Sequence, residues 1–489
     1  MSKLDTIIRG GRVATASDTV VCDVGIRAGR IVALGEDLGQ ADEVIDARAK
    51  LVLPGGIDSH VHLSQPSGPG IVMADDFESG TRAAAFGGNT LVMPFCMQQK
   101  GQSLRQAVKD YHALAHGRCH IDVSFHLIIS DPSPQVLGQE LPALVSDGYT
   151  SFKVFMTYAD LALDDMQLLQ VFSTARATGA LVMVHAENYD AIRFLTEQLE
   201  RAGNTAPRFH GTSRPIPVER EATHRAISLA QLVDVPIMIV HVSNGEAMEQ
   251  IRWAQSRGLK VFGETCPQYL VLTEKDMEGL NMEGAKYVCS PPPRDEESQK
   301  ACWLGLETGV FQLYSSDHCP FRYDSPQGKL NPKGRTSFQW VPNGIPGIET
   351  RLPILFSEGV IKGRLTLNQF VALSATNHAR MYGLHPRKGT IAVGADADIA
   401  IWDPDRRVKI TQGILHHGSD YTPYEGLEVT GWPVTTIVRG RAVVRDGHLV
   451  GSAGTGQHVT RERSPHAVPA GVSVAGFEPA ERFGDKPAP

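Results

Sequence analysis

Eight short apolar segments, separated by stretches with helical periodicity, are the feature that most constrains the fold of this chain. They lie at residues 57–62, 90–95, 122–129, 151–156, 180–185, 236–241, 259–264 and 311–317. Continuous apolar runs are typical of parallel strands buried on both faces, and the longer periodic stretches between them are typical of crossover helices. Eight β/α repeats are the number that closes a barrel. The sequence therefore predicts an α/β fold with a (β/α)8 TIM-like barrel over residues 55–384.

Both ends of the chain show a different pattern. Residues 1–54 contain short β-like runs separated by glycine turns, as in "DTIIRGGRVA" and "DVGIRAGRIVAL". The same pattern occurs again over 385–455, as in "TTIVRGRAVVRDGHLVG". These patterns indicate hairpins. Neither end has enough strands to bury both faces of a sheet, so we expect the two ends to form one small β-sandwich domain. Residues 456–489 are rich in Pro, Gly and Ala, and we expect no separate core there.

Polar residues close several of the apolar runs. In a barrel of this kind the chemistry lies at the C-terminal ends of the strands, so these residues are candidates for the site. His60 and His62 end the first run in "GGIDSHVHL", and alternation along a strand points both rings to the same side. His185, His241 and Asp317 end the fifth, sixth and eighth runs. Each of these residues alone is also compatible with an ordinary packed or capping position.

Lys153 is the least expected of the polar residues, because it lies inside the fourth run, "SFKVFM". A buried ammonium is strongly disfavoured unless something neutralises it or uses it. Four histidines, one carboxylate and one lysine at equivalent positions of a barrel favour a metal site, since neutral imidazoles and carboxylates are the usual ligands.

Composition argues against several other classes of protein. The net charge of −7 gives no basic surface for nucleic acid or for anionic membranes, so we expect a small-molecule partner. The 7 cysteines are scattered without CxxC spacing, which argues against a disulfide framework or a thiolate zinc site. No signal-peptide pattern and no apolar run of roughly 18 residues is present, which predicts a cytoplasmic protein without a membrane partner.

Seven motifs resemble the amidohydrolase superfamily and, within it, the cyclic amidases typified by dihydropyrimidinase and D-hydantoinase. They are "GGIDSHVHL", "SFKVFMTY", "VHAEN", "IVHVS", "CSPPPRD", "SSDHCPF" and "PNGIPGIETRLP". The resemblance implies an enzyme that opens the cyclic amide bond of dihydropyrimidines or 5-substituted hydantoins to give N-carbamoyl amino acids. It also implies a homotetramer, in which the tail over 456–489 is a possible arm between subunits.

The resemblance further implies two divalent metal ions, usually zinc, and a carboxylated lysine at Lys153 that bridges them. Carboxylation would convert the disfavoured buried ammonium into an anionic ligand. The implied metal ligands are His60, His62, Lys153, His185, His241 and Asp317.

The remaining roles implied by the resemblance concern the substrate. Asp317 is the implied acceptor and donor of the proton during ring opening, and Tyr158 is the implied donor to the oxyanion. Ser290 and Asn343 match positions at which backbone groups hold the cyclic amide.

Substrate choice stays open at this point. Relatives that open dihydroorotate or allantoin generally have an arginine two residues after the histidine pair, whereas Ser64 stands here, which favours a ring with hydrogen or an apolar substituent. The sequences of segments 66–71 and 95–99 differ from those of typical dihydropyrimidinases, so a cyclic imide hydrolase or an allantoinase remains an alternative. A non-catalytic dihydropyrimidinase-like scaffold is a further alternative, although all six ligand positions are occupied.

Overall fold

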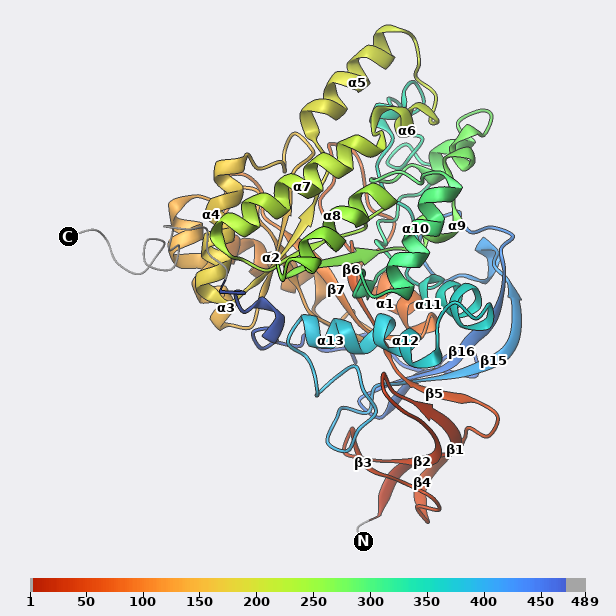
Figure 1. Ribbon diagram of the computed structural model, residues 1–489. Coiled ribbons are helices and arrows are strands. Elements are labelled where there is room, and N and C mark those ends of the chain that lie inside the picture. The colour runs from red at the N-terminus through yellow and green to blue at the C-terminus, as the bar shows by residue number, and fades with distance from the viewer. Residues whose placement is uncertain (1–2, 472–489) are drawn as a thin grey trace, which may run out of the picture.

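A parallel sheet forms the centre of the computed structural model, which describes residues 3–471 (Figure 1). Its strands follow the order of the chain, and β8 (Asp122–Val123) pairs beside this path with β7. The path runs through β6 (Gly56–Val61), β7 (Asn89–Met97), β9 (His126–Ile128), β10 (Ser151–Phe155), β11 (Leu181–His185), β12 (Ile237–Ile239), β13 (Val261–Thr265) and β14 (Leu313–Tyr314). Each strand lies within one of the predicted apolar runs or overlaps it.

The sheet closes on itself between its first and last strands. Val61, at the end of β6, forms a parallel bridge to His318, and the His62 amide donates a 2.7 Å hydrogen bond to the His318 carbonyl. All pairings within the sheet are parallel. The predicted (β/α)8 barrel is therefore confirmed, and its strands bring their carboxyl ends to one rim.

Helices cover the outside of this sheet and connect its strands (Figure 1). The longer ones are α1 (Phe77–Phe86), α2 (Leu104–Ala115), α4 (Asp165–Thr178), α5 (Tyr189–Arg201), α7 (Ile216–Val233), α8 (Gly245–Ser256) and α10 (Glu296–Glu307). The shorter ones are α3 (Leu141–Ser146), α6 (Phe209–Ser213), α9 (Gln268–Val271), α11 (Arg351–Leu355), α12 (Leu367–Val371) and α13 (Asn377–Met381). Local sequence explains their ends: α4, for example, begins with a capping box between Asp164 and Gln167 and ends at Gly179, whose φ of 74° suits glycine.

A second sheet of nine strands combines the two ends of the chain. From the N-terminal part come β1 (Leu4–Ala14), β2 (Thr19–Arg27), β3 (Arg30–Gly35), β4 (Ala41–Asp46) and β5 (Leu51–Pro54). From the C-terminal part come β15 (Ile399–Lys409), β16 (Glu428–Val438), β17 (Arg441–Arg445) and β18 (His448–Leu449). β5 joins them, because it pairs parallel with β1 and antiparallel with β15.

The second sheet folds over a core of its own. The first half of β1 pairs with β4 and the second half with β5, and the register with β2 shifts between Ile8 and Gly11. Ile8, Val24 and Ile399, from strands of both chain ends, pack in one buried cluster. The predicted small β domain built from both ends is therefore confirmed, while its exact limits, 1–54 with 385–455, stay a prediction.

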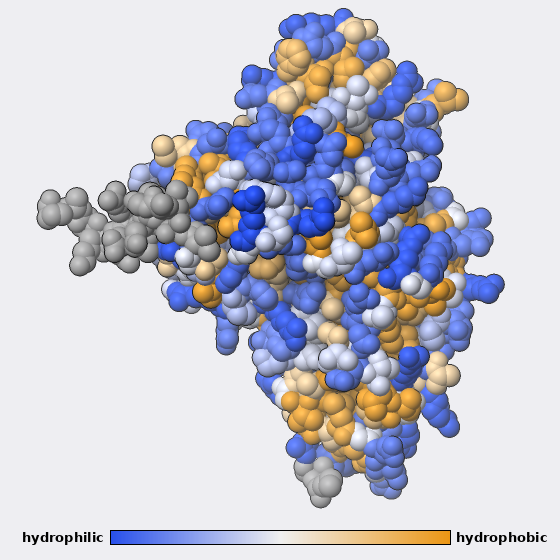
Figure 2. All heavy atoms as spheres, viewed as in Figure 1, coloured by the Kyte–Doolittle hydropathy of each residue, from blue (hydrophilic) through white to orange (hydrophobic). Residues whose placement is uncertain are grey.

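Apolar side chains are also exposed on this small domain. Figure 2 shows them gathered at the bottom of the view, over β1 to β4. They include Val20, Val21, Leu34 and Val44, which are 54%, 63%, 39% and 47% exposed. The small domain, which lies away from the barrel rim, thus carries an exposed apolar patch.

The first part of the predicted tail packs on the barrel of its own chain. Val459 is buried and its amide donates to the Val123 carbonyl. Arg461 is buried as well and donates to Ser151 Oγ at 2.7 Å. The rest of the predicted arm, 472–489, lies outside the described residues. Among residues 3–471, none of the helices has both the length and the apolar character needed to cross a bilayer.

Candidate active site

His60, His62 and Asp317 form one half of a buried cluster at the rim of the barrel. His60 lies in β6 and His62 directly follows it, so strand alternation places both rings on the same side, with centroids 5.6 Å apart. Asp317 follows β14 by three residues. Its Oδ1 lies 3.2 Å from His60 Nε2 and 3.3 Å from His62 Nε2. Three ligand atoms this close to one another can hold a metal ion.

Lys153, His185 and His241 form the other half. Lys153 lies within β10, is 1% exposed, and its Nζ is 3.3 Å from His60 Nε2. His185 ends β11, His241 follows β12 by two residues, and His241 Nε2 lies 2.9 Å from His185 Nδ1. The structure therefore brings all six predicted ligand residues together, although the sequence places them on five different strands or strand ends.

The protonation states suit a metal. Burial lowers the pKa of His60 and His241 well below the ordinary histidine value and also lowers that of His185, so these rings are neutral and offer lone pairs. Burial alone would raise the pKa of Asp317, but the neighbouring His60, His62 and Lys153 outweigh it and lower that pKa. His241 Nδ1 is buried without a hydrogen-bond partner among the described residues. Neutral imidazoles beside a carboxylate are the donor set of a divalent ion.

Lys153 has an unusual environment for an amine. Burial lowers its pKa from 10.5 to about 8, against the opposing effect of Asp317 and Glu264. Its Nζ lies 5.0 Å from the ring centroid of Phe95 and 5.2 Å from that of Phe155. Lys153 forms no ion pair within residues 3–471. A much larger fraction of this amine is neutral near pH 7 than for a lysine in water.

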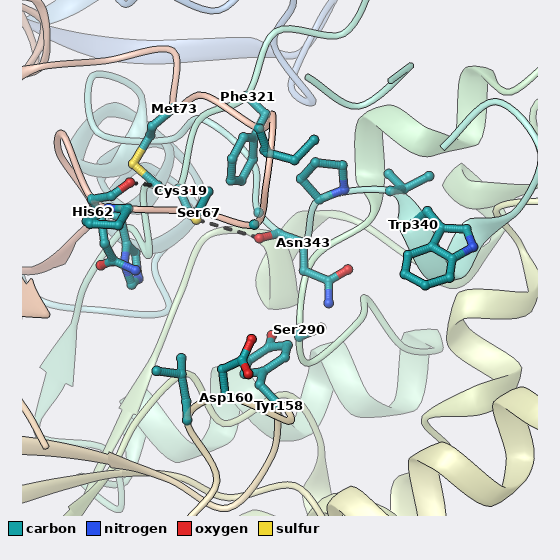
Figure 3. A pocket seen from close by; sticks show the side chains of 18 of the residues that line it. His62, Ser67, Met73, Tyr158, Asp160, Ser290, Cys319, Phe321, Trp340 and Asn343 are labelled. Carbon is teal, nitrogen blue, oxygen red and sulfur yellow. Dashed lines mark hydrogen bonds between the residues drawn. The ribbon is translucent and has the colours of Figure 1, made fainter. Parts of the chain in front are cut away.

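A cavity of about 950 Å³ opens beside the cluster (Figure 3). Tyr158, Ser290 and Asn343 line it together with Asp317, so the predicted substrate-binding residues face the predicted ligands. Burial raises the pKa of Tyr158 to about 12, while Arg214, Ser290 and Asn343 act in the opposite direction. The phenol therefore stays protonated near neutral pH and can donate a hydrogen bond into the cavity.

The backbone is in the left-handed region at three of the site residues. Tyr158, His241 and Asp317 have φ values of 71°, 42° and 49°. Such angles are uncommon for residues other than glycine and cost on the order of 1–3 kcal/mol each. All three residues line the cavity, so the uncommon backbone angles occur at the candidate site.

Comparisons with known proteins agree with this geometry. A profile of the amidohydrolase family matches residues 51–443. The chain belongs to the amidohydrolase family. It is 48% identical over 460 residues to a D-hydantoinase of Geobacillus stearothermophilus, covering 94% of this chain and 96% of that protein.

Two solved structures extend the comparison within the family. The dihydropyrimidinase of Brevibacillus agri is 46% identical, with a TM-score of 0.91 over 94% of this chain and 99% of that one. An L-hydantoinase (dihydropyrimidinase) of Arthrobacter aurescens is 31% identical, with a TM-score of 0.85 over 94% of this chain and 100% of that one. The predicted resemblance to the hydantoinase and dihydropyrimidinase group is confirmed.

Glu264 is a residue of the site that sequence reasoning missed. It lies in β13, is completely buried, and places Oε1 2.6 Å from His60 Nδ1. Ser315 Oγ donates to its other oxygen at 2.8 Å. A carboxylate on the outer nitrogen of a histidine fixes which ring nitrogen faces the site. The signal was present, because Glu264 closes the seventh apolar run exactly as the histidines close theirs.

Two further partners hold His185 and His62. Glu187 Oε2 lies 2.7 Å from His185 Nε2 and accepts a 2.7 Å hydrogen bond from Arg214 Nη1. Gln65 Oε1 lies 2.7 Å from His62 Nδ1. Both partners lie in loops beyond a strand, where no periodicity marks them, so the sequence alone gives no signal for their role.

Cys319 lines the cavity but lacks the features of a nucleophile. Burial raises the pKa of its thiol, and Asp317 raises it further. Its sulfur donates to the Asn343 carbonyl at 3.6 Å, which is one of the dashed contacts in Figure 3. A protonated thiol held in this way acts as packing.

Proposed function

We propose that this protein is a metal-dependent hydrolase that opens the cyclic amide of hydantoins and dihydropyrimidines to give N-carbamoyl amino acids. The observation that carries the proposal is the convergence of the six ligand residues beside a cavity lined by Tyr158, Ser290 and Asn343. The D-hydantoinase and dihydropyrimidinase relatives support the same reaction, since they match this chain over nearly its whole length.

The residues that would hold the cofactor follow from the geometry. His60, His62 and Asp317 would hold one divalent ion, and His185 with His241 would hold a second. Zinc is the ion that this donor set most often takes. When bound, such ions polarise a carbonyl and lower the pKa of water so that it becomes nucleophilic near neutral pH.

Lys153, as a carboxylated lysine, would supply a further anionic ligand to these ions. Its neutral amine can attack carbon dioxide, and loss of one proton from nitrogen then leaves an anionic carbamate. The lowered pKa of Lys153, about 8, supports this step because only the neutral amine reacts. The product would remove the cost of a buried ammonium that forms no ion pair among residues 3–471.

The side chains of the cavity would carry the remaining steps. The carboxylate of Asp317 would accept the proton released as water attacks the amide carbonyl and would return it to the departing nitrogen. Tyr158 would donate to the oxygen on which negative charge develops. Backbone groups at Ser290 and Asn343 would hold the cyclic amide in place.

The walls of the cavity support an apolar or absent ring substituent. Met73, Phe321 and Trp340 line it; Figure 3 shows Met73 beside His62 and Trp340 across the cavity from His62. The predicted loop over 66–71 lines it as well. Ser64 stands at the position where allantoin- and dihydroorotate-opening relatives have arginine, so the chain has no cationic side chain there. These features favour hydantoins and dihydropyrimidines over rings with an anionic group.

Assembly and location belong to the same proposal. A homotetramer is supported by the exposed apolar side chains on β1 to β4, which contact with another copy would cover. A cytoplasmic location stays a prediction from the sequence.

A substrate panel tests the proposed function. The enzyme loaded with Zn²⁺ and bicarbonate is given hydantoin, a 5-aryl hydantoin, dihydrouracil, allantoin and a cyclic imide, and the ring-opened products are separated and quantified. We expect the highest kcat/KM on a hydantoin or on dihydrouracil. A higher kcat/KM on the imide or on allantoin would replace the proposal with that activity, and no opening of any ring would favour the scaffold alternative.

A further inference from the structure

Lys329 is a further buried lysine, for which the proposed function has no role. Its side chain is 0% exposed, and it forms no ion pair within the described part of the chain. Its Nζ donates to two backbone carbonyls, that of Val288 at 2.8 Å and that of Pro342 at 3.0 Å. An ammonium buried without a carboxylate is expensive, so its retention indicates a use for these two bonds.

The two carbonyls belong to the two segments that carry the proposed substrate-binding residues. Val288 precedes Ser290 by two residues, and Pro342 directly precedes Asn343. Both Ser290 and Asn343 line the cavity, where Figure 3 shows them on neighbouring segments. Lys329 therefore connects the backbones of both segments, and it is not itself among the residues that line the cavity.

One further bond joins the same two segments. The Gly344 amide donates to the Val288 carbonyl at 3.0 Å, so this carbonyl accepts both from Gly344 and from Lys329. In the sequence, the two segments are about fifty residues apart, and they belong to different loops of the barrel. Val288 and Val341 share one buried apolar cluster, and Cys289 and Ile345 share another. The directional contacts that fix the spacing of the two backbones are the three hydrogen bonds above, of which Lys329 donates two.

Burial affects both the strength of these hydrogen bonds and the protonation of the lysine that donates them. Hydrogen bonds from a charged donor are shorter and stronger than neutral ones, and low dielectric strengthens them further. Burial also lowers the pKa of Lys329 to about 7, against the opposing effect of Cys289 and Cys319, so near neutral pH the side chain donates partly as an ammonium and partly as a neutral amine. The donation to the Pro342 carbonyl polarises the peptide whose N–H belongs to Asn343, which makes that N–H a better hydrogen-bond donor.

We propose that Lys329 is a positioning residue, which sets the distance between the segments of Ser290 and Asn343 and so determines how well rings of different size are held. This inference rests on the proposed function, which assigns binding of the cyclic amide to these two segments. A five-membered hydantoin and a six-membered dihydropyrimidine present the same amide group on rings of different width. How strongly the enzyme prefers one ring over the other then depends on the distance between the two segments, which Lys329 maintains.

The test uses Lys329→Met, which keeps the apolar stem and removes the donors, and Lys329→Gln, which keeps a neutral donor. Lys300→Met, an exposed lysine on α10, is the matched control. kcat and KM are measured for hydantoin and for dihydrouracil with the metal-loaded full-length enzyme. We expect Lys329→Met to raise KM by about tenfold or more, with kcat less affected, and to change the ratio of the two kcat/KM values by about threefold or more. Lys329→Gln falls between Lys329→Met and the wild type.

A second measurement does not depend on activity. Hydrogen exchange is followed in the unliganded enzyme for peptides that cover 286–292 and 340–346, with a peptide over 55–65 as internal reference. We expect both loop peptides to exchange faster in Lys329→Met and in Lys329→Gln, while the reference stays unchanged.

The outcomes separate the inference from the function on which it rests. Unchanged KM values and an unchanged substrate ratio, or loop exchange equal to that of the wild type, would overturn the positioning role. An equal fall in kcat for both substrates at constant KM would also overturn it, since this pattern indicates general structural damage. A wild-type enzyme that opens no ring would refute the proposed function, and the exchange experiment would still decide whether Lys329 fixes the two segments.

Discussion

Tyr158→Phe is the substitution whose effect the structure predicts most fully. It removes one hydroxyl from the cavity and keeps the ring. The ring contacts survive, because a phenylalanine retains the packing against His185, with centroids 5.5 Å apart, and against Phe155 at 6.0 Å. The Arg214 guanidinium, 5.7 Å from the ring centroid, also keeps its partner. We therefore expect the free energy of unfolding to fall by less than about 1 kcal/mol.

The expected loss of activity depends on the stage of the reaction at which the Tyr158 hydroxyl donates its hydrogen bond. Its hydrogen bond strengthens as negative charge develops on the carbonyl oxygen, so its loss lowers kcat more than it raises KM. Removal of one oxyanion donor costs on the order of 10²–10³ in kcat, which is about 2.7–4 kcal/mol. The effect should be constant from neutral pH upward until the phenol ionises, because burial raises the pKa of Tyr158 to about 12.

The assay is the steady-state rate of hydantoin and dihydrouracil opening, followed by separation of the N-carbamoyl products, with bound metal measured in parallel. Tyr149→Phe is the matched control: its hydroxyl contacts His112 and it is not among the residues that line the cavity. We expect full metal content in both variants and wild-type kcat only in the control. Wild-type kcat in Tyr158→Phe would refute the reasoning and leave the oxyanion to the metal ions alone.

Three further outcomes are expected. Lys153→Ala should lose bound metal and nearly all activity, with partial recovery in short carboxylic acids, and full metal content with ordinary turnover would exclude the carbamate. Asp317→Asn should retain most of its metal, because the amide oxygen can still coordinate, while ring opening falls severely because the proton acceptor is lost; unchanged turnover would count against this role. Acid should destabilise the fold through neutral histidines that lie outside the ligand set, the buried His210 and His378 and the half-buried His458, since burial lowers the pKa of each to about 3. Between about pH 6.5 and pH 3 the unfolded chain binds more protons, so each histidine lowers the free energy of unfolding by up to about 1.4 kcal/mol per pH unit as the pH falls. Urea titrations between pH 7 and 5 check this slope, and a stability that is flat over this range would contradict it.

The sequence predicted the fold because the pattern that defines the barrel is local. Each strand is an apolar run, each crossover is a periodic stretch, and their number alone indicates closure. The candidate ligands could be selected for a related reason: His60, His62, His185 and His241 each stand where an apolar run ends, and Lys153 interrupts one. The closing contact between Val61 and His318 was not visible, because it joins residues that are far apart in the chain.

The residues that support the site were harder to predict. Glu264 carried the same signal as the histidines, but a glutamate at the end of a run is also an ordinary surface residue. Glu187 and Lys329 lie in loops, where no period distinguishes a buried side chain from an exposed one. Their roles depend on contacts among three or more segments, such as the bonds of Lys329 to Val288 and Pro342, and only the folded chain shows these contacts.

The central claim, that this chain is a metal-dependent hydrolase of cyclic amides, is tested most directly by removal and return of the metal. The purified protein is treated with a chelator, dialysed, and assayed for hydantoin and dihydrouracil opening before and after addition of Zn²⁺ with bicarbonate. We predict that ring opening disappears with the metal and returns as about two ions bind per chain. Ring opening that persists in metal-free protein, or a protein that neither binds zinc nor opens either ring after its addition, would contradict the claim.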